Sequence, residues 1–131
     1  MTGTKKDLIQ YRLDRAKETL GDAEILAEKQ RWNSAINRLY YSAYYAVSAL
    51  LISNHISSTT HNGVKTLFSV NYIKTGIFPT ETGRIYSQLF TWRQKGDYDD
   101  LFDFDSEKVL PYFEPVKTII ELIEEHIHSK S

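Results

Sequence analysis

The 131-residue chain contains no cysteine, which excludes disulfides, zinc–thiolate sites and thiol nucleophiles. It also lacks a large excess of charge of either sign, because 16 basic and 17 acidic side chains give a formal net charge of −1. No global field therefore drives the chain onto nucleic acid or anionic lipid, and any anion site must be local. No apolar run approaches the roughly twenty residues that span a bilayer, and residues 1–30 lack the apolar core of a signal peptide. We expect a cytoplasmic protein without a membrane partner.

Glycine and proline are scarce, at six and three residues, and they fall between periodic segments. This distribution favours long helices with short connections over many short strands. The length fits one compact domain, with no internal repeat or low-complexity linker to divide it. The sequence therefore predicts a single all-α domain over residues 1–131, built as an up-and-down bundle of four to five helices.

Five amphipathic segments are predicted, and their ends carry several local signals. They cover residues 4–29, 33–53, 60–75, 81–93 and 106–128. The first repeats apolar residues at three- and four-residue steps: Leu8, Tyr11, Leu13, Ala16, Leu20 and Ala23. The second has the broadest apolar face, which suits a helix at the centre of a bundle or one that also contacts a partner subunit. Asn33 is expected to cap the second segment, Gly96 to end the fourth and Pro115 to kink the fifth.

The stretch "NRLYYSAYY", residues 37–45, groups polar and aromatic side chains on one side of the second segment. Asn37, Tyr41, Tyr44 and Tyr45 fall within about a 100° sector at 3.6 residues per turn. In one interpretation Asn37 projects into a cleft, where the tyrosines hydrogen-bond or stack on a base. In the other, the tyrosines form a core and dimer face while Asn37 bonds a neighbouring helix. The pattern alone leaves both open.

His61 opens the third segment, in "THNGV". A histidine at this position can donate to an anion or act as an acid or base near neutral pH. It can equally cap the helix or brace the turn before it. Both interpretations stand at this stage.

The stretch "RQKGDYD", residues 93–99, places an arginine at the expected end of the fourth segment. The planar guanidinium of Arg93 suits bidentate contacts with phosphate. Asp97 is close enough in the chain to pair with Arg93 and quench its charge, so a salt-bridged helix end is the alternative. The acidic run that follows lacks the glycine and glutamate spacing of an EF-hand, and we expect a solvated loop. His126 and His128 diverge on a helix, so no metal site is expected, and no cofactor-binding fingerprint is present.

Taken in order, these motifs resemble those of the HEPN domain family of bacteria and archaea. The resemblance covers nearly the whole chain, from "YRLDRAKETLGDAEIL" through "WNSAINRLYYSAYYAVSALL", "THNGV" and "FSVNYIKTG" to "RQKGDYD". It implies a helical bundle that pairs into a homodimer, with its second and fourth helices near a shared cleft. Many members are metal-independent RNases, including toxins of toxin–antitoxin pairs, and others pair with a minimal nucleotidyltransferase.

The RNase signature of that family is an arginine followed, after four to six residues, by a histidine. Arg93 matches the family arginine by position, but no histidine follows it at that spacing. The chain has an Arg-x-x-x-Asp-Tyr motif instead, formed by Arg93, Asp97 and Tyr98. Metal-free RNA cleavage needs a group that moves the 2′-hydroxyl proton, and a tyrosine with a pKa near 10 is a poor base at neutral pH. Tyr98 is also a candidate acceptor for modification by a partner nucleotidyltransferase.

The sequence therefore predicts a homodimeric HEPN-type module that binds a nucleotide or RNA without the usual RNase pair and needs no cofactor. The expected ligand-binding residues are Asn37, Tyr41, His61, Arg93, Asp97 and Tyr98. Its expected partner is a nucleotidyltransferase in a toxin–antitoxin-like or stress system. One alternative is a divergent metal-independent RNase that uses Arg93 and His61 as catalytic residues. Another is a non-enzymatic protein-interaction module.

Overall fold

The structure is a computed structural model that describes residues 4–98 and 103–130, with the backbone alone for residues 96–98. Every regular element in these ranges is helical. The elements are α1 (Lys5–Glu28), α2 (Trp32–Ser53), α3 (His61–Phe68), the π-helical η1 (Ser69–Ile73), α4 (Thr80–Tyr98), α5 (Ser106–Val109), the 3₁₀-helical η2 (Leu110–Tyr112) and α6 (Phe113–Ser129). The prediction of an all-α helical bundle is confirmed.

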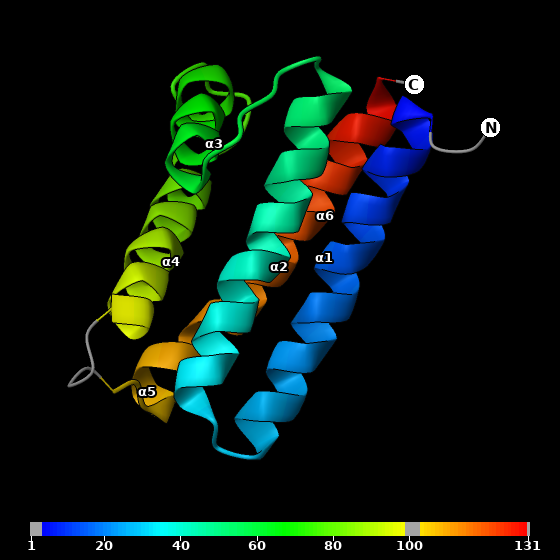
Figure 1. Ribbon diagram of the computed structural model, residues 1–131. Coiled ribbons are helices and arrows are strands. Elements are labelled where there is room, and N and C mark those ends of the chain that lie inside the picture. Colours follow the sequence, from blue (N-terminus) through cyan, green and yellow to red (C-terminus); the bar gives the residue numbers. More distant parts are fainter. Residues whose placement is uncertain (1–3, 99–102, 131) are drawn as a thin grey trace.

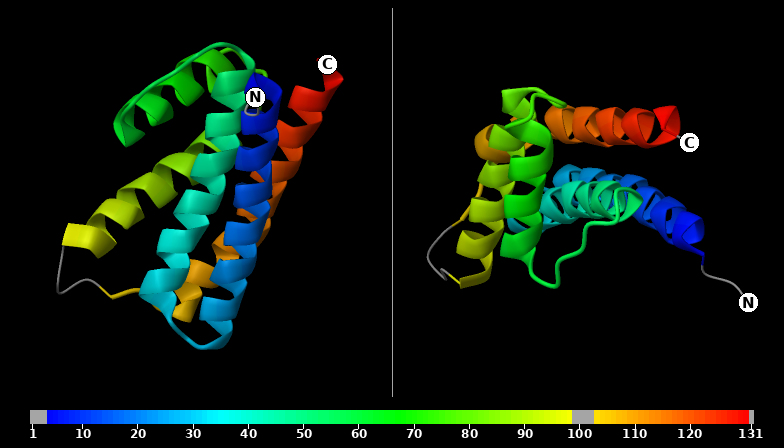
Figure 2. Two further views of the ribbon diagram at one scale, coloured as in Figure 1. Left: turned by 45° about the vertical axis from the view of Figure 1, so that its right-hand side comes forward. Right: turned by 90° about the horizontal axis from the view of Figure 1, so that it is seen from above.

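Helix α2 is the centre of the bundle. It contacts α1, α6, α4 and α3 (Figures 1 and 2). The pair formed by α3 and α4 lies on the side of α2 away from α1 (Figure 1). The buried residues of α2 are Ala35, Ile36, Leu39, Tyr40, Ser42, Ala43, Ala46, Val47, Ala49, Leu50 and Leu51. Because they occupy more than one face of the helix, α2 must be covered on several sides, as its broad apolar face predicted.

Small side chains line the contact between α1 and α2. Ala16 and Ser42 are fully buried, and the Ser42 hydroxyl donates a 2.7 Å hydrogen bond to the Ala16 carbonyl oxygen. The buried stripe of α1 is Leu13, Ala16, Thr19 and Ala23. Two residues expected in that stripe lie outside it, because Leu8 is 41% exposed and Tyr11 is 59% exposed. The stripe is therefore shorter at the start of α1 than the repeat predicted.

The first turn of α2 differs from the prediction. Asn33 is not the N-cap, because α2 begins at Trp32 and Arg31 precedes it without a side-chain cap. The Asn33 side chain instead accepts a 2.8 Å hydrogen bond from the Phe104 backbone N–H and donates one of 3.1 Å to Asp103. Asn33 thus fastens the segment before α5 to the start of α2.

Two helix-breaking residues act elsewhere than expected. The fifth segment is interrupted at Leu110–Tyr112, and Pro115 lies in the first turn of α6 rather than at a kink. Proline is tolerated in a first turn because the N–H it lacks has no intrahelical partner there. Gly96 does not end α4, which continues to Tyr98. A single glycine costs a helix only about 1 kcal/mol relative to alanine.

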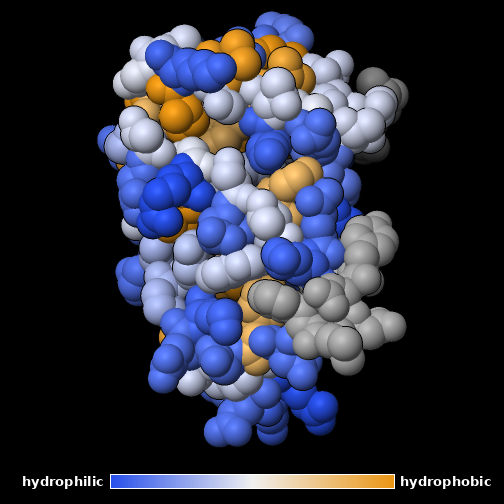
Figure 3. Space-filling model, turned by 90° about the vertical axis from the view of Figure 1, so that its left-hand side faces the viewer, coloured by the Kyte–Doolittle hydropathy of each residue, from blue (hydrophilic) through white to orange (hydrophobic). Residues whose placement is uncertain are grey.

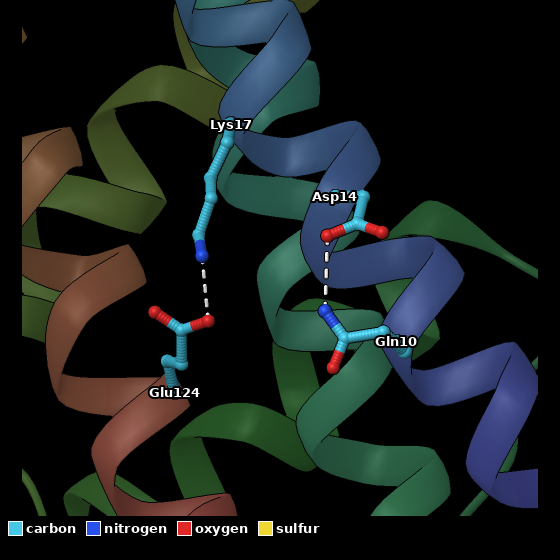
Figure 4. A network of polar contacts seen from close by, with 4 residues as sticks. All are labelled: Gln10, Asp14, Lys17 and Glu124. Atoms are coloured by element: carbon cyan, nitrogen blue, oxygen red, sulfur yellow. Dashed lines mark hydrogen bonds and ion pairs between the residues drawn. The ribbon is translucent and has the colours of Figure 1, made fainter.

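Helices α1 and α6 are joined at their surface by an ion pair between Lys17 and Glu124, whose Nζ and Oε2 atoms lie 2.6 Å apart (Figure 4). One turn earlier on α1, Gln10 donates to Asp14 (Figure 4). Within residues 4–98 and 103–130, no helix has the length and the apolar character that crossing a membrane requires.

Figure 3 shows the face of the molecule that carries α3 and α4. Apolar atoms gather at one end of this face, and hydrophilic atoms dominate the rest. Val70 in η1 and Ile77 in the turn before α4 are among the exposed large apolar residues, at 47% and 46%.

Candidate functional site

Three segments that are distant in the sequence meet at one cluster. Helix α2 supplies Tyr40, Tyr41 and Tyr44, α3 supplies His61, and α4 supplies Arg93. We call these five side chains the tyrosine cluster. All of its members except the buried Tyr40 are partly exposed.

The cap of α3 explains why His61 stands where it does. The Thr60 hydroxyl accepts a 2.9 Å hydrogen bond from the Gly63 backbone N–H, which makes His61 the first residue of the helix. A Cβ on Gly63 would lie 2.1 Å from the Ser58 Oγ, so a larger residue there would require the Ser58 side chain to move.

His61 contacts three tyrosines of α2. Its Nδ1 lies 2.8 Å from the Tyr40 hydroxyl. The ring centres of His61 and Tyr44 are 4.6 Å apart, and the Tyr41 ring meets His61 edge-on at 5.7 Å. The interpretation in which His61 caps α3 is wrong, because Thr60 is the N-cap. His61 forms part of an aromatic surface whose other members come from α2.

Arg93 lies over the same aromatic surface. Its guanidinium carbon is 5.6 Å from the Tyr40 ring centre and 5.5 Å from that of Tyr41. These distances are typical of cation–π contacts, which hold a guanidinium in place without neutralising its charge. His61 and Arg93 are thus brought together on the two adjacent tyrosines, from segments 32 residues apart in the chain.

The cluster alters the ionisation of two of its members. Burial lowers the pKa of His61, and the positive charge of Arg93 lowers it further. His61 is therefore neutral at pH 7. Burial raises the pKa of Tyr40 to about 12, so its hydroxyl remains protonated. The cluster presents one fixed cation and a neutral imidazole.

Asn37 reaches the cluster through a neighbour that sequence analysis did not select. Its side-chain oxygen accepts hydrogen bonds of 3.2 and 2.9 Å from Nε and Nη2 of Arg38. The Arg38 guanidinium carbon in turn lies 5.0 Å from the Tyr41 ring centre. The three-residue spacing from Arg38 to Tyr41 places both on one helix face and is the signal that identifies this second cation.

Two of the expected ligand-binding residues fall outside the described side chains. Asp97 and Tyr98 belong to the last turn of α4, for which the structure describes the backbone alone. The predicted pairing of Asp97 with Arg93, and the predicted role of Tyr98, stay predictions. Tyr45, also singled out in the sequence, lies beside Arg15 of α1, whose guanidinium carbon is 5.2 Å from its ring centre.

A cation and an imidazole on an aromatic platform suit a particular class of ligand. A guanidinium and an N–H donor bind phosphate oxygens, and exposed tyrosine rings stack on unpaired bases. Among the residues that the structure describes, no three histidine or carboxylate side chains converge to hold a metal ion.

A pocket lies elsewhere, at the end of the bundle where α1 begins and α6 ends. Figure 1 shows where these two helix ends lie. The volume of the pocket is about 470 Å³, and its lining includes Lys5, Lys6 and Lys130 around the apolar Ile9 and Ile127. None of the residues predicted for ligand binding lines it. We place the candidate site at the tyrosine cluster, because it brings a guanidinium and an imidazole together on tyrosine rings.

Known proteins resemble this chain along most of its length. It is 37% identical to a UPF0332 protein of Thermotoga maritima over 94% of this chain and 93% of that protein. It is 30% identical to each of two proteins of Methanocaldococcus jannaschii that carry the name "Putative toxin". Those alignments cover 73% and 71% of this chain, and 65% and 69% of the two relatives. Residues 9–126 match the HEPN domain. The chain belongs to the HEPN domain family.

Proposed function

We propose that this chain binds RNA or a nucleotide at the tyrosine cluster and does not cleave it. The observation that carries this proposal is the meeting of His61 and Arg93 on the rings of Tyr40 and Tyr41. Arg93 contacts phosphate, His61 donates a second hydrogen bond to it, and Tyr41 and Tyr44 stack on a base. Asn37 orients Arg38 at the edge of the same surface. In this proposal Asp97 orients Arg93, and Tyr98 completes the binding surface.

We further propose that the chain acts as a cytoplasmic homodimer beside a minimal nucleotidyltransferase in a toxin–antitoxin-like or stress system. Membership of the HEPN family and the two relatives named "Putative toxin" support this context. The exposed Val70 and Ile77 offer an apolar surface for a partner chain. Light scattering of the purified protein tests the dimer, and co-purification with the product of an adjacent nucleotidyltransferase gene tests the partner.

The binding proposal is tested by titrating a fluorescent single-stranded oligoribonucleotide with wild type and Arg93→Ala. A charge-assisted hydrogen bond contributes roughly 1.5–3 kcal/mol, so the affinity should fall about tenfold or more. Arg84→Ala is the matched control, because it removes one positive charge from the same helix at an exposed pair with Glu81. Equal losses in the two variants, or no loss in Arg93→Ala, would rule out a specific role for Arg93.

A second candidate function is metal-independent RNA cleavage by Arg93 and His61, which the proximity of the two side chains favours. Total RNA is incubated in EDTA with wild type, Arg93→Ala and His61→Ala, beside a known RNase. Our proposal predicts intact RNA with all three proteins. Cleavage by wild type that disappears in both variants would establish the enzyme in place of the binding module.

A further inference from the structure

Tyr86 is the one core tyrosine next to the cluster to which the binding proposal gives no role. It lies on α4 two turns before Arg93 and is 1% exposed. Its ring centre is 5.9 Å from that of Tyr40. Its hydroxyl is buried and has no partner of good hydrogen-bond geometry among the residues that the structure describes. A buried hydroxyl donor in this situation needs an acceptor nearby.

Tyr40 is a cluster tyrosine whose ring packs against that of Tyr86, which makes the Tyr40 hydroxyl a candidate acceptor. Burial raises the pKa of Tyr40, and the neighbouring Tyr86 hydroxyl opposes that rise. On its other side, the Tyr40 hydroxyl lies 2.8 Å from His61 Nδ1. The Tyr86 hydroxyl, the Tyr40 hydroxyl and His61 Nδ1 therefore form a chain of polar groups that runs from the core to the imidazole.

Each tyrosine hydroxyl has one proton, so Tyr40 can donate to only one of its two neighbours, Tyr86 or His61. If Tyr86 donates to Tyr40, the Tyr40 proton is directed at His61 Nδ1, and the neutral imidazole carries its proton on Nε2. If His61 Nδ1–H donates to Tyr40 instead, the Tyr40 proton turns toward Tyr86. The Tyr86 proton then has no acceptor inside the core. The first arrangement is favoured, because it satisfies the buried donor.

We propose that Tyr86 and Tyr40 are positioning residues that hold neutral His61 as the Nε2–H tautomer. The tautomer is set by contacts inside the protein and needs no ligand. Its use in phosphate recognition rests on the proposed function. In this tautomer Nε2 donates to a phosphate oxygen, and Nδ1 is occupied by Tyr40. Neither nitrogen can accept the 2′-hydroxyl proton of RNA, so the same hydrogen-bond chain favours binding over cleavage.

The test is long-range proton–nitrogen NMR of the ¹⁵N-labelled full chain without ligand, at about pH 8, where the imidazole is neutral. Wild type should show a pyridine-like Nδ1 and a pyrrole-like Nε2 for His61. Tyr86→Phe removes only the hydroxyl and should shift the tautomer population toward Nδ1–H, and Tyr40→Phe should shift it further. Tyr72→Phe is the control, because Tyr72 is also buried but bonds Asn54. It should leave His61 unchanged.

RNA binding gives a second, quantitative readout. The apparent dissociation constant rises as the inverse of the competent fraction. If Tyr86→Phe lowers the Nε2–H fraction to one half, its affinity for the oligoribonucleotide should fall about twofold. An Nδ1–H tautomer in wild type, or an unchanged tautomer in both Tyr86→Phe and Tyr40→Phe, overturns the proposal. Because the NMR measurement contains no RNA, that failure is distinct from a failure of the protein to bind RNA.

Discussion

The Arg93 guanidinium carbon lies 5.5 Å from the centre of the Tyr41 ring. Arg38, from the same helix as Tyr41, lies 5.0 Å from that centre. One partly exposed ring therefore positions two cations that belong to different helices. We expect this arrangement to hold the two guanidinium groups in fixed positions at the ring.

Tyr41 should accordingly matter through its ring and not through its hydroxyl. Tyr41→Leu removes both the cation–π contacts and the stacking surface, which contribute roughly 1–3 kcal/mol per base. Its affinity for single-stranded RNA should fall on the order of tenfold, measured by fluorescence anisotropy. Tyr41→Phe keeps the ring and should stay within about twofold of wild type. Equal losses in the two variants would assign the role to the hydroxyl.

The free energy of unfolding should depend on pH through His61. Burial and the charge of Arg93 hold its pKa below the ordinary value of 6.5 in the folded chain. As the pH falls below 6.5, the unfolded chain takes up the proton first. The folded state therefore loses stability between that value and its own lower pKa. His126 acts in the same direction, because burial lowers its pKa too.

Urea unfolding at about pH 7.5 and about pH 5.5 measures this loss. The difference in the free energy of unfolding between the two pH values should be smaller in His61→Gln than in wild type. It should be smaller still when His126→Gln is added. The comparison uses the difference and not the absolute stability, since each substitution also removes contacts. An equal difference in wild type and the double variant would contradict the assignment.

Two glycines should respond in opposite ways to substitution by alanine. Gly21 lies inside α1 with nothing within 4 Å of an added Cβ, so Gly21→Ala should stabilise the fold by about 0.5–1 kcal/mol. Gly76 has a φ of +79°, so Gly76→Ala should destabilise it by roughly 1–2 kcal/mol. Thermal and urea unfolding measure both. A Gly76→Ala variant as stable as wild type would mean that the turn before α4 does not need its left-handed glycine.

The ion pair between α1 and α6 should contribute little, although its atoms lie 2.6 Å apart. Both side chains are partly exposed, so Lys17→Met or Glu124→Gln should change the free energy of unfolding by less than about 1 kcal/mol. Ile123→Ala, at the neighbouring and fully buried position, should cost about 2–5 kcal/mol. A larger effect from the ion pair than from Ile123 would reverse this order of contributions.

Local signals in the sequence predicted most of the helices. Thr4 forms a capping box with Asp7, and Asp105 accepts from the Lys108 backbone N–H, as their types and spacing indicate. The second helix was predicted from its apolar repeat, which forms the centre of the core. These features depend on residues within a few positions of one another.

One error occurred where a distant contact decides the outcome, and another where a local signal was too weak to end a helix. Asparagine often caps helices, but the Asn33 side chain accepts a hydrogen bond from the Phe104 backbone N–H, 71 residues away. Glycine often ends a helix, but α4 continues past Gly96. Arg38 was missed although its three-residue spacing to Tyr41 is a local signal, whereas the meeting of Arg38 and Arg93 on one ring depends on the tertiary fold. His61 and Arg93 were both selected from the sequence, but their common position on α2 depends on the tertiary fold.

The central claim is that RNA binds at the tyrosine cluster, and an NMR titration of the labelled full chain with a short single-stranded oligoribonucleotide tests it most directly. The account predicts saturable shifts that are largest at the His61 imidazole, the Arg93 Nε–Hε group and the Tyr41 ring. Shifts confined to Lys5 and Lys130, at the pocket between the ends of α1 and α6, would contradict it. So would the absence of saturable shifts anywhere in the chain.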